Sequence, residues 1–190
     1  MGTFSKISEN AFNELQTDAG VLLKEFDPES PTLVPSNIIC ATTGGINPSC
    51  VPSYSDLFED IDNAPKNTME GLHLDGWDCS LGFTALSITG ETIKLALGAA
   101  GIDSGAIKPR DHVSTGEDDE ESDFRDIWWV GDLSNGGCVA VCLKNAISTG
   151  GFSLQTTKNG KGRLSVTLKG FVSAAAQTEI PMEFYVLSGN

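Results

Sequence analysis

Residues 138–172 decide the fold class, and they read CVAVCLKNAISTGGFSLQTTKNGKGRLSVTLKGFV. Asn159-Gly160 is a strong hairpin signal, because a two-residue type I′ turn requires positive φ at both central positions. Apolar and polar residues alternate on both sides of this turn, over residues 152–157 and 164–169. A period of two is typical of strands with one face on a core and one polar face.

Gly150-Gly151 joins this predicted hairpin to a third apolar run at residues 139–143. We therefore predict a three-stranded antiparallel meander. A long hairpin with two different faces can cover a small sandwich, or it can pair with copies of itself in an assembly.

One helix is predicted, beginning after Thr89, which can act as its N-cap. Gly98 or Gly101 can end it. Ile93 and Leu97 lie four residues apart, so we expect this stripe to pack on a sheet. The other apolar runs are short and predict strands at residues 21–26, 37–42, 69–74, 80–89, 124–133 and 180–187. The predicted class is all-β with one helix.

Residues 47–65 contain three prolines and several carboxylates, so we predict an irregular loop there. Leu57, Phe58 and Ile61 form an apolar patch inside it. Either the patch holds the loop on its own core, or it contacts a neighbouring subunit; both interpretations stay open.

Trp128 and Trp129 are adjacent in a predicted strand, so their side chains point to opposite faces. One indole must leave the core face, which indicates an interface.

The length of 190 residues suits a single domain, 1–190. We predict an N-terminal arm at residues 1–19, and whether it docks on a neighbour stays open. Residues 115–123 carry six carboxylates, and such a run repels itself, so we predict a solvated acidic loop.

The net charge is −14 with only 12 lysines and arginines, which argues against a nucleic-acid-binding face. Negative charge keeps a protein soluble, and it also repels phosphates. We expect neither a secretory signal nor a membrane span, because no apolar run approaches about 18 residues.

The residues that usually carry catalysis or bind metals follow no recognisable spacing. Five cysteines show no framework pattern, there is no C-x-x-C pair, and His73 and His112 lie away from any zinc-like spacing. There is also no G-x-S-x-G elbow and no phosphate-binding loop. We expect reduced cysteines, no metal, no cofactor, no catalytic residue and no enzymatic activity.

Four runs taken together resemble the major tail protein, or tail tube protein, of long-tailed, siphovirus-like bacteriophages. They are GWDCSLGFT at 76–84, GETIKLALGAA at 90–100, DIWWVGDL at 126–133, and FSLQTTKNGKG at 152–162. The resemblance covers about residues 71–187, and the acidic run at 117–123 departs from it as an apparent insertion.

This resemblance implies a β-sandwich or barrel-like tail-tube fold with a long β-hairpin that pairs between subunits. It implies stacked hexameric rings that form the tail tube of the virion, the conduit for DNA ejection into the host. The implied partners are further copies of this chain, the tape-measure protein and other tail proteins. DNA passes through without specific binding, no membrane is involved, and assembly takes place in the host bacterial cytoplasm.

Two sets of residues are predicted to serve this assembly. Inter-subunit contacts are predicted at Leu57, Phe58, Ile61, Trp128 and Trp129. The hairpin face turned away from the core is predicted to line the lumen through Ser153, Gln155, Thr157, Ser165, Thr167 and Lys169. We expect the acidic loop on the outer surface. The alternative function is a β-sandwich binding or decoration module of a virion surface, and an enzyme of unrecognised type is a third.

Overall fold

The computed structural model describes residues 7–8, 10–116 and 121–189. Within them the chain forms ten strands, one α-helix and three short 3-10 helices. In chain order they are β1 (Gln16–Leu23), η1 (Pro35–Asn37), β2 (Thr42–Asp56), η2 (Met69–Gly71), β3 (Leu72–Ala85), α1 (Gly90–Leu97), β4 (Ala100–Asp103), β5 (Ala106–Pro109), β6 (Arg125–Leu133), β7 (Cys138–Ser148), β8 (Ser153–Gln155), β9 (Arg163–Gly170), η3 (Ala174–Ala176) and β10 (Met182–Leu187).

Eight of the strands form one antiparallel sheet in the order β1-β6-β7-β9-β3-β2, with β10 added beside β7 and β8 beside β9. β4 and β5 form a separate two-stranded hairpin. The predicted all-β fold with one helix is therefore confirmed.

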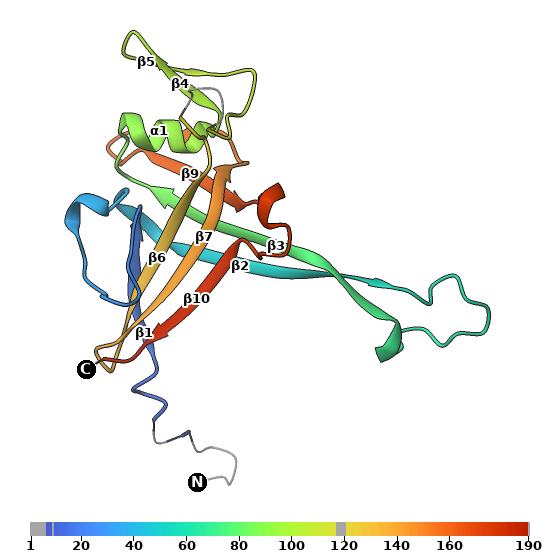
Figure 1. Ribbon diagram of the computed structural model, residues 1–190. Helices are drawn as coiled ribbons and strands as arrows, with labels where there is room; N and C mark the ends of the chain where they lie inside the picture. The colour runs from blue at the N-terminus through green and yellow to red at the C-terminus, as the bar shows by residue number, and fades with distance from the viewer. Residues whose placement is uncertain (1–6, 9, 117–120, 190) are drawn as a thin grey trace.

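The large sheet bends over itself, and β7 is the strand that both halves share. Most of β7 pairs with β6 and β10, whereas residues 146–148 pair with β9. Figure 1 shows β6, β7 and β10 crossing over β3 and β2. The core lies between the two halves and combines Leu81 and Phe83 of β3 with Ile127 of β6 and Leu143 of β7.

The predicted three-stranded meander is wrong. β7 and β8 lie one after the other on the same side of β9, since β3 occupies the other side. The glycine pair at 150–151 therefore separates β7 from β8 without reversing the direction of the chain. The β8–β9 hairpin exists, but its turn runs from Thr157 to Gly160, whose amide donates to the Thr157 carbonyl at 3.1 Å. Only Asn159 has positive φ, at 61°, so the turn is not type I′.

The two arms of the β8–β9 hairpin differ in burial. Leu164, Val166 and Leu168 of β9 are buried, as the alternation predicts. Phe152 and Leu154 stay exposed because β8 lies beyond the end of β7, past the edge of the core.

The long hairpin of this fold is formed by β2 and β3. The sequence predicted strands over most of β3, but it predicted an irregular loop at residues 47–65, which include most of β2. β2 has 15 residues and β3 has 14. Pro48 and Pro52 are tolerated because β2 is an edge strand, and prolines four residues apart direct their nitrogens to the same side. The ladder between β2 and β3 is continuous from Ile46 to Ser53. The proline nitrogens therefore point to the other side of β2, the edge that has no neighbouring strand in the sheet.

The predicted strand at 37–42 is also wrong. The chain forms η1 there and then a single bridge between Ile38 and Leu23. Gly44 and Gly45 do not end a strand: with φ of 78° and 84° they form a bulge inside β2, between Thr43 and Ile46.

β1 begins inside the predicted N-terminal arm, at Gln16, and residues 1–6 and 9 lie outside the described part of the chain. The strand bulges between Thr17 and Val21. A Cβ on Gly20 would come within 2.5 Å of Trp129 Nε1, and φ at Gly20 is 70°, so only glycine fits against this indole.

Helix α1 has the predicted cap but buries a different stripe. The Thr89 hydroxyl accepts from the Thr92 amide, and the Thr92 hydroxyl accepts from the Thr89 amide. The buried residues are Thr92, Leu95 and Ala96, while Ile93 and Leu97 are only partly buried. The helix is rotated by about one residue from the predicted orientation because Thr92 is drawn inward by its bonds to the cap.

We expect Leu95→Ala to lower the free energy of unfolding by about 2–5 kcal/mol, because Leu95 is 5% exposed in the core. Ile93→Ala is the matched control on the same helix and should cost less. Urea denaturation of both variants measures the difference. Equal losses, or a greater loss for Ile93→Ala, would contradict the observed orientation of the helix.

Candidate functional site: interaction surfaces

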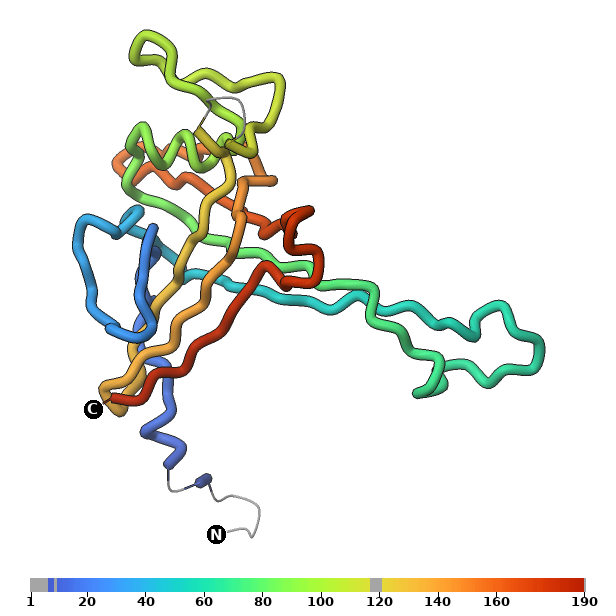
Figure 2. The backbone as a smooth tube through the Cα atoms, in the orientation of Figure 1, coloured from blue at the N-terminus to red at the C-terminus, as the bar shows by residue number. Residues whose placement is uncertain are grey.

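The outer part of the β2–β3 hairpin projects from the body. β3 pairs with β9 only over residues 80–85, so residues 50–79 form a two-stranded ribbon whose ladder joins β2 to β3 alone. Figures 1 and 2 show this ribbon extending far beyond the rest of the sheet. We call residues 50–79 the projecting hairpin. An isolated two-stranded ribbon is only marginally stable in water.

One face of the projecting hairpin continues the core face of the body. In β3, residues 79, 81, 83 and 85 are buried, and Trp77 follows on the same face. The register shifts at Asp75, which carries this face on to Leu74 and Leu72. Tyr54 lies directly opposite Leu74 and shares its face.

These side chains are exposed although they prolong the core. Trp77 is 38% exposed, Tyr54 53% and Leu72 59%. A contiguous exposed apolar surface of this kind is typical of an interaction site. The strands predicted from the sequence end at residue 74 and begin again at residue 80, so this continuous surface was not predicted. The signal that could have found it is the alternation running unbroken through residues 77–85.

The tip of the projecting hairpin, residues 57–71, carries the predicted patch. Leu57 is 61% exposed and Ile61 55%. Phe58 is partly buried, because its ring lies against Gly71, where a Cβ would be 3.0 Å from the ring. The Leu57 amide donates to the Gly71 carbonyl at 2.8 Å and closes the loop. The structure thus presents Leu57 and Ile61 outward and uses Phe58 within the loop.

The tip is also strongly acidic. Residues 57–71 contain four carboxylates, at Glu59, Asp60, Asp62 and Glu70, against a single lysine, Lys66, and Asp56 directly precedes them. The Asp56 carboxylate stabilises the start of this loop, since it accepts a hydrogen bond from the Phe58 amide at 2.9 Å.

A basic groove lies at the other end of β3. Its volume is about 360 Å³, and Lys161 and Arg163 line it together with Leu86 and Thr43. Lys158 precedes Lys161 and Arg163 in the same turn, so residues 156–163 carry three cations and no carboxylate. Exposed Ile88 and Leu154 both approach Gly162 beside the groove. The groove therefore combines positive charge with apolar surface.

The tip and the basic groove are separated by the full length of β3. The tip precedes Leu72, the groove includes Leu86, and the strand between them spans about 45 Å at 3.3 Å per residue. The two surfaces cannot meet within one chain, but they complement each other in charge and in apolar content.

The adjacent tryptophans point to opposite faces of β6. Trp129 is 9% exposed in the core, and its Nε1 donates to the Ala19 carbonyl at 3.0 Å. Trp128 lies on the other face between Phe26 and Tyr185, with ring centroids 5.5 and 5.6 Å away. Trp129 is therefore enclosed by its own subunit, whereas Trp128 packs against two rings of the same subunit and stays partly exposed.

The Trp128 face is held by a polar cluster on β10 and β7. The Tyr185 hydroxyl donates to Glu183 at 2.7 Å, and Lys144 Nζ pairs with the same carboxylate at 2.5 Å. The hydrogen bond from Lys144 lowers the pKa of Glu183. Beyond this cluster β10 is an edge strand on which Phe184 and Val186 are exposed.

Five of the six residues predicted to line a lumen lie on β8 and β9, whereas Thr157 belongs to the turn that follows β8. Of the six, five are exposed, namely Ser153, Gln155, Thr157, Ser165 and Thr167. Lys169 is partly buried and pairs with Asp78 at 2.8 Å, so its charge is compensated.

The acidic segment is described only at its two ends. Residues 117–120 lie outside the described part of the chain. Glu121 pairs with Lys94 of α1 at 2.6 Å. Asp123 was predicted to belong to a solvated loop, which is wrong for this residue: its side chain is fully buried and accepts from Arg110 Nη2 at 2.5 Å and from the Ser114 amide at 2.9 Å.

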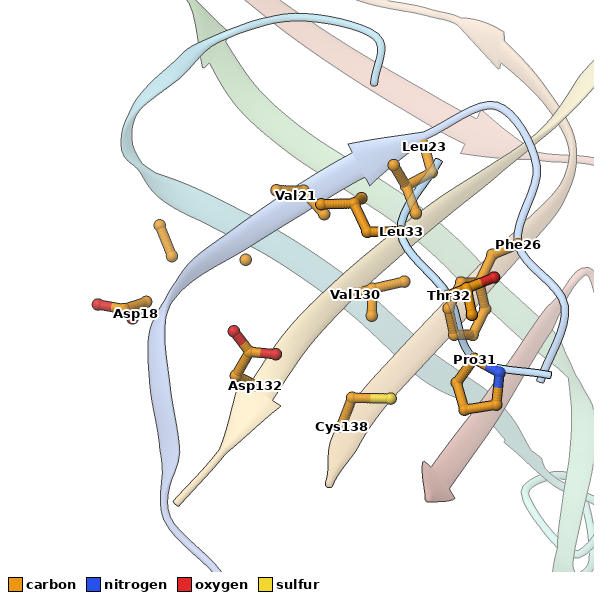
Figure 3. A pocket seen from close by; sticks show the side chains of 12 residues that line it. Asp18, Val21, Leu23, Phe26, Pro31, Thr32, Leu33, Val130, Asp132 and Cys138 are labelled. Carbon is orange, nitrogen blue, oxygen red and sulfur yellow. The ribbon is translucent and has the colours of Figure 1, made fainter. Parts of the chain in front are cut away.

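A pocket of about 290 Å³ lies between β1, the loop after it, and the ends of β6 and β7. Figure 3 shows Asp18 and Asp132 on one side and Leu33 and Val130 among its apolar walls. Burial and the Asp132 carboxylate raise the pKa of the Cys138 thiol, so this thiol is a poor nucleophile at neutral pH. The lining residues include no histidine, lysine or arginine.

Within the described residues, no three potential metal ligands gather at one place. The same residues contain no helix with the length and apolarity needed to cross a bilayer.

No protein family and no curated protein matches the sequence. One similar solved structure is the virion of a native gene transfer agent particle. The similarity covers 88% of this chain and 95% of that chain at 11% identity, with a TM-score of 0.41. A likeness of this size assigns neither family nor function.

Proposed function

We propose that this chain is a structural protein of a bacteriophage-like virion that self-assembles into stacked hexameric rings. These rings form the tail tube, the conduit through which DNA is ejected into the host. The sequence resemblance to major tail proteins supports this proposal. The observation that carries it is the projecting hairpin, whose apolar face continues the core and ends at an acidic tip.

The projecting hairpin needs a second copy of the chain to cover it. Its exposed tryptophan, tyrosine and leucines prolong a core face, and burying a large apolar side chain stabilises by about 1.5–3 kcal/mol. A neighbouring copy can supply that burial, and the ribbon then gains the support that it lacks alone.

The tip and the basic groove determine the direction of association. Carboxylates at Glu59, Asp60 and Asp62 of one copy approach Lys161 and Arg163 of the next. A contact between two different surfaces is heterologous, so it continues from copy to copy as a ring or a filament. Complementary charge also selects this pairing over tip-to-tip contact, where carboxylates would meet.

Edge strands offer the second, lateral mode of association. β2 has β3 on one side, and β10 has β7 on one side. Pairing of such edges between copies closes a ring and removes the exposed edges. Exposed Phe184 and Val186 on β10 would be covered in the same step.

In this proposal Ser153, Ser165 and Thr167 line the lumen together with Lys169, whose charge Asp78 compensates. Gln155 and Thr157 also line the basic groove, so they are covered with it. A conduit for DNA must not hold phosphates, so the three cations of residues 156–163 have to be covered. The acidic tip of a neighbour covers them and neutralises their charge. DNA then passes without specific binding, while the tape-measure protein and other tail proteins are the further partners.

Replacing the exposed residues of the tip tests the proposed function. We expect Leu57→Ser with Ile61→Ser to leave a folded monomer that no longer forms tubes, because both side chains face outward. Analytical ultracentrifugation and negative-stain electron microscopy measure assembly, and circular dichroism measures folding.

Ile102→Ser with Val113→Ser is the matched control, since both side chains are exposed on the body away from the tip. This control should assemble normally. Tubes that persist unchanged in the tip variant would show that the patch serves only its own loop.

A further inference from the structure

Two cysteines face each other across the β2–β3 ladder. Cys50 and Cys79 are directly opposite in the register, and their Sγ atoms lie 3.2 Å apart as free thiols. Opposite residues in an antiparallel pair have Cβ atoms about 4.5–5.5 Å apart, and a disulfide needs about 3.5–4.5 Å. A small approach of the two strands is sufficient to join them.

The two cysteines lie where the projecting hairpin joins the body of the sheet. The ladder between β3 and β9 begins at Ser80, so Cys79 is the first residue of β3 beyond it. Cys79 is fully buried in the core, while Cys50 is partly buried at its rim. The pair therefore lies at the base of the projecting hairpin, and a reagent from solvent reaches Cys50 first.

We propose that Cys50 and Cys79 are a disulfide-forming site that locks the base of the projecting hairpin, with a low-molecular-weight disulfide such as oxidised glutathione as the oxidant. This property is independent of the proposed role in tail assembly.

The reaction proceeds by two thiol–disulfide exchanges. The Cys50 thiolate attacks one sulfur of oxidised glutathione, which forms a mixed disulfide and releases the first glutathione thiolate. The Cys79 sulfur then attacks Cys50 Sγ, which forms the Cys50–Cys79 bond and releases the second glutathione. The two protons lost by the cysteines are taken up by the two glutathione thiolates, so two protein thiols are oxidised and one disulfide is reduced.

The second exchange sets the rate. Burial is the largest cause of the raised pKa of Cys79, and it persists when Cys50 has become a mixed disulfide, so the Cys79 thiolate stays scarce at neutral pH. Disulfide formation should therefore accelerate as the pH rises.

The test uses the folded, full-length chain, incubated with oxidised glutathione, alkylated, and digested without reduction for peptide mass spectrometry. We expect a Cys50 peptide linked to a Cys79 peptide, while Cys40, Cys138 and Cys142 remain alkylated. Cys79→Ser should instead accumulate the glutathione adduct at Cys50, and Cys138→Ser should leave the link intact. Five alkylated cysteines, or an adduct at Cys50 that never closes onto Cys79, would overturn the proposal.

Hydrogen exchange measures the locking itself. Amides of residues 50–56 and 72–79 should exchange about tenfold more slowly, or slower still, in the oxidised chain, because a cross-link removes open states of the ribbon. Unchanged exchange in a chain that carries the link would overturn the locking role.

Discussion

Lys161→Glu with Arg163→Glu is expected to lower association between copies by at least about a hundredfold and to abolish tubes. Both side chains line the basic groove, and the acidic tip of a neighbour would then meet like charge. Juxtaposed like charges in an interface cost several kcal/mol, and about 1.4 kcal/mol changes an association constant tenfold. Sedimentation velocity measures the association.

Reversing the charge of the tip should restore assembly only when the charge of the basic groove is reversed in the same chain. Glu59→Lys with Asp60→Lys is expected to abolish tubes alone, for the same reason as the groove variant. A chain that carries both reversals has opposite charges again at each contact, so its tubes should return. If the combined chain stays monomeric while folded, the tip and the groove are not partners.

Lys24→Glu with Lys108→Glu is the control of equal charge change. Lys108 is exposed and Lys24 is partly buried, and both form ion pairs at the surface, with Asp103 and Glu91, that contribute little to stability. This control should assemble as the unmodified chain does, which separates contact at the groove from the effect of net charge.

The second large effect is expected at Asp123. Asp123→Ala should lower the free energy of unfolding by about 3–5 kcal/mol, because it removes the carboxylate that Arg110 contacts in a buried pair. The Ser114 amide loses an acceptor in the same substitution. Urea denaturation measures the loss.

Glu121→Gln is the matched control two residues away. Its side chain is 77% exposed and pairs with Lys94 at the surface, so the expected loss is below about 1 kcal/mol. A loss at Asp123 no larger than at Glu121 would contradict the buried pair.

The fold class could be predicted from the sequence because local signals agreed with one another. Alternation in β9 predicted its buried leucines, and Thr89 predicted the helix start. The adjacent tryptophans predicted two faces of one strand, which the structure confirms.

The β2 arm of the long hairpin could not be located from the sequence, because what makes it a strand is its position in the folded sheet. Pro48 and Pro52 normally indicate a loop, and only the edge position of β2 makes them compatible with a strand. Asp123 likewise looks like its acidic neighbours in the sequence, and only the folded chain brings Arg110 and Ser114 to it. The basic groove joins residues 43 and 86 to the turn at 156–163, and no local pattern reports such a junction.

The most direct test of the proposed assembly is negative-stain electron microscopy of the purified, unmodified chain over a range of concentrations. We predict closed rings with an open centre, stacked into hollow tubes whose length grows with concentration. A folded chain that remains a monomer at every concentration, with no rings or tubes on the grid, would contradict a role as tail-tube subunit.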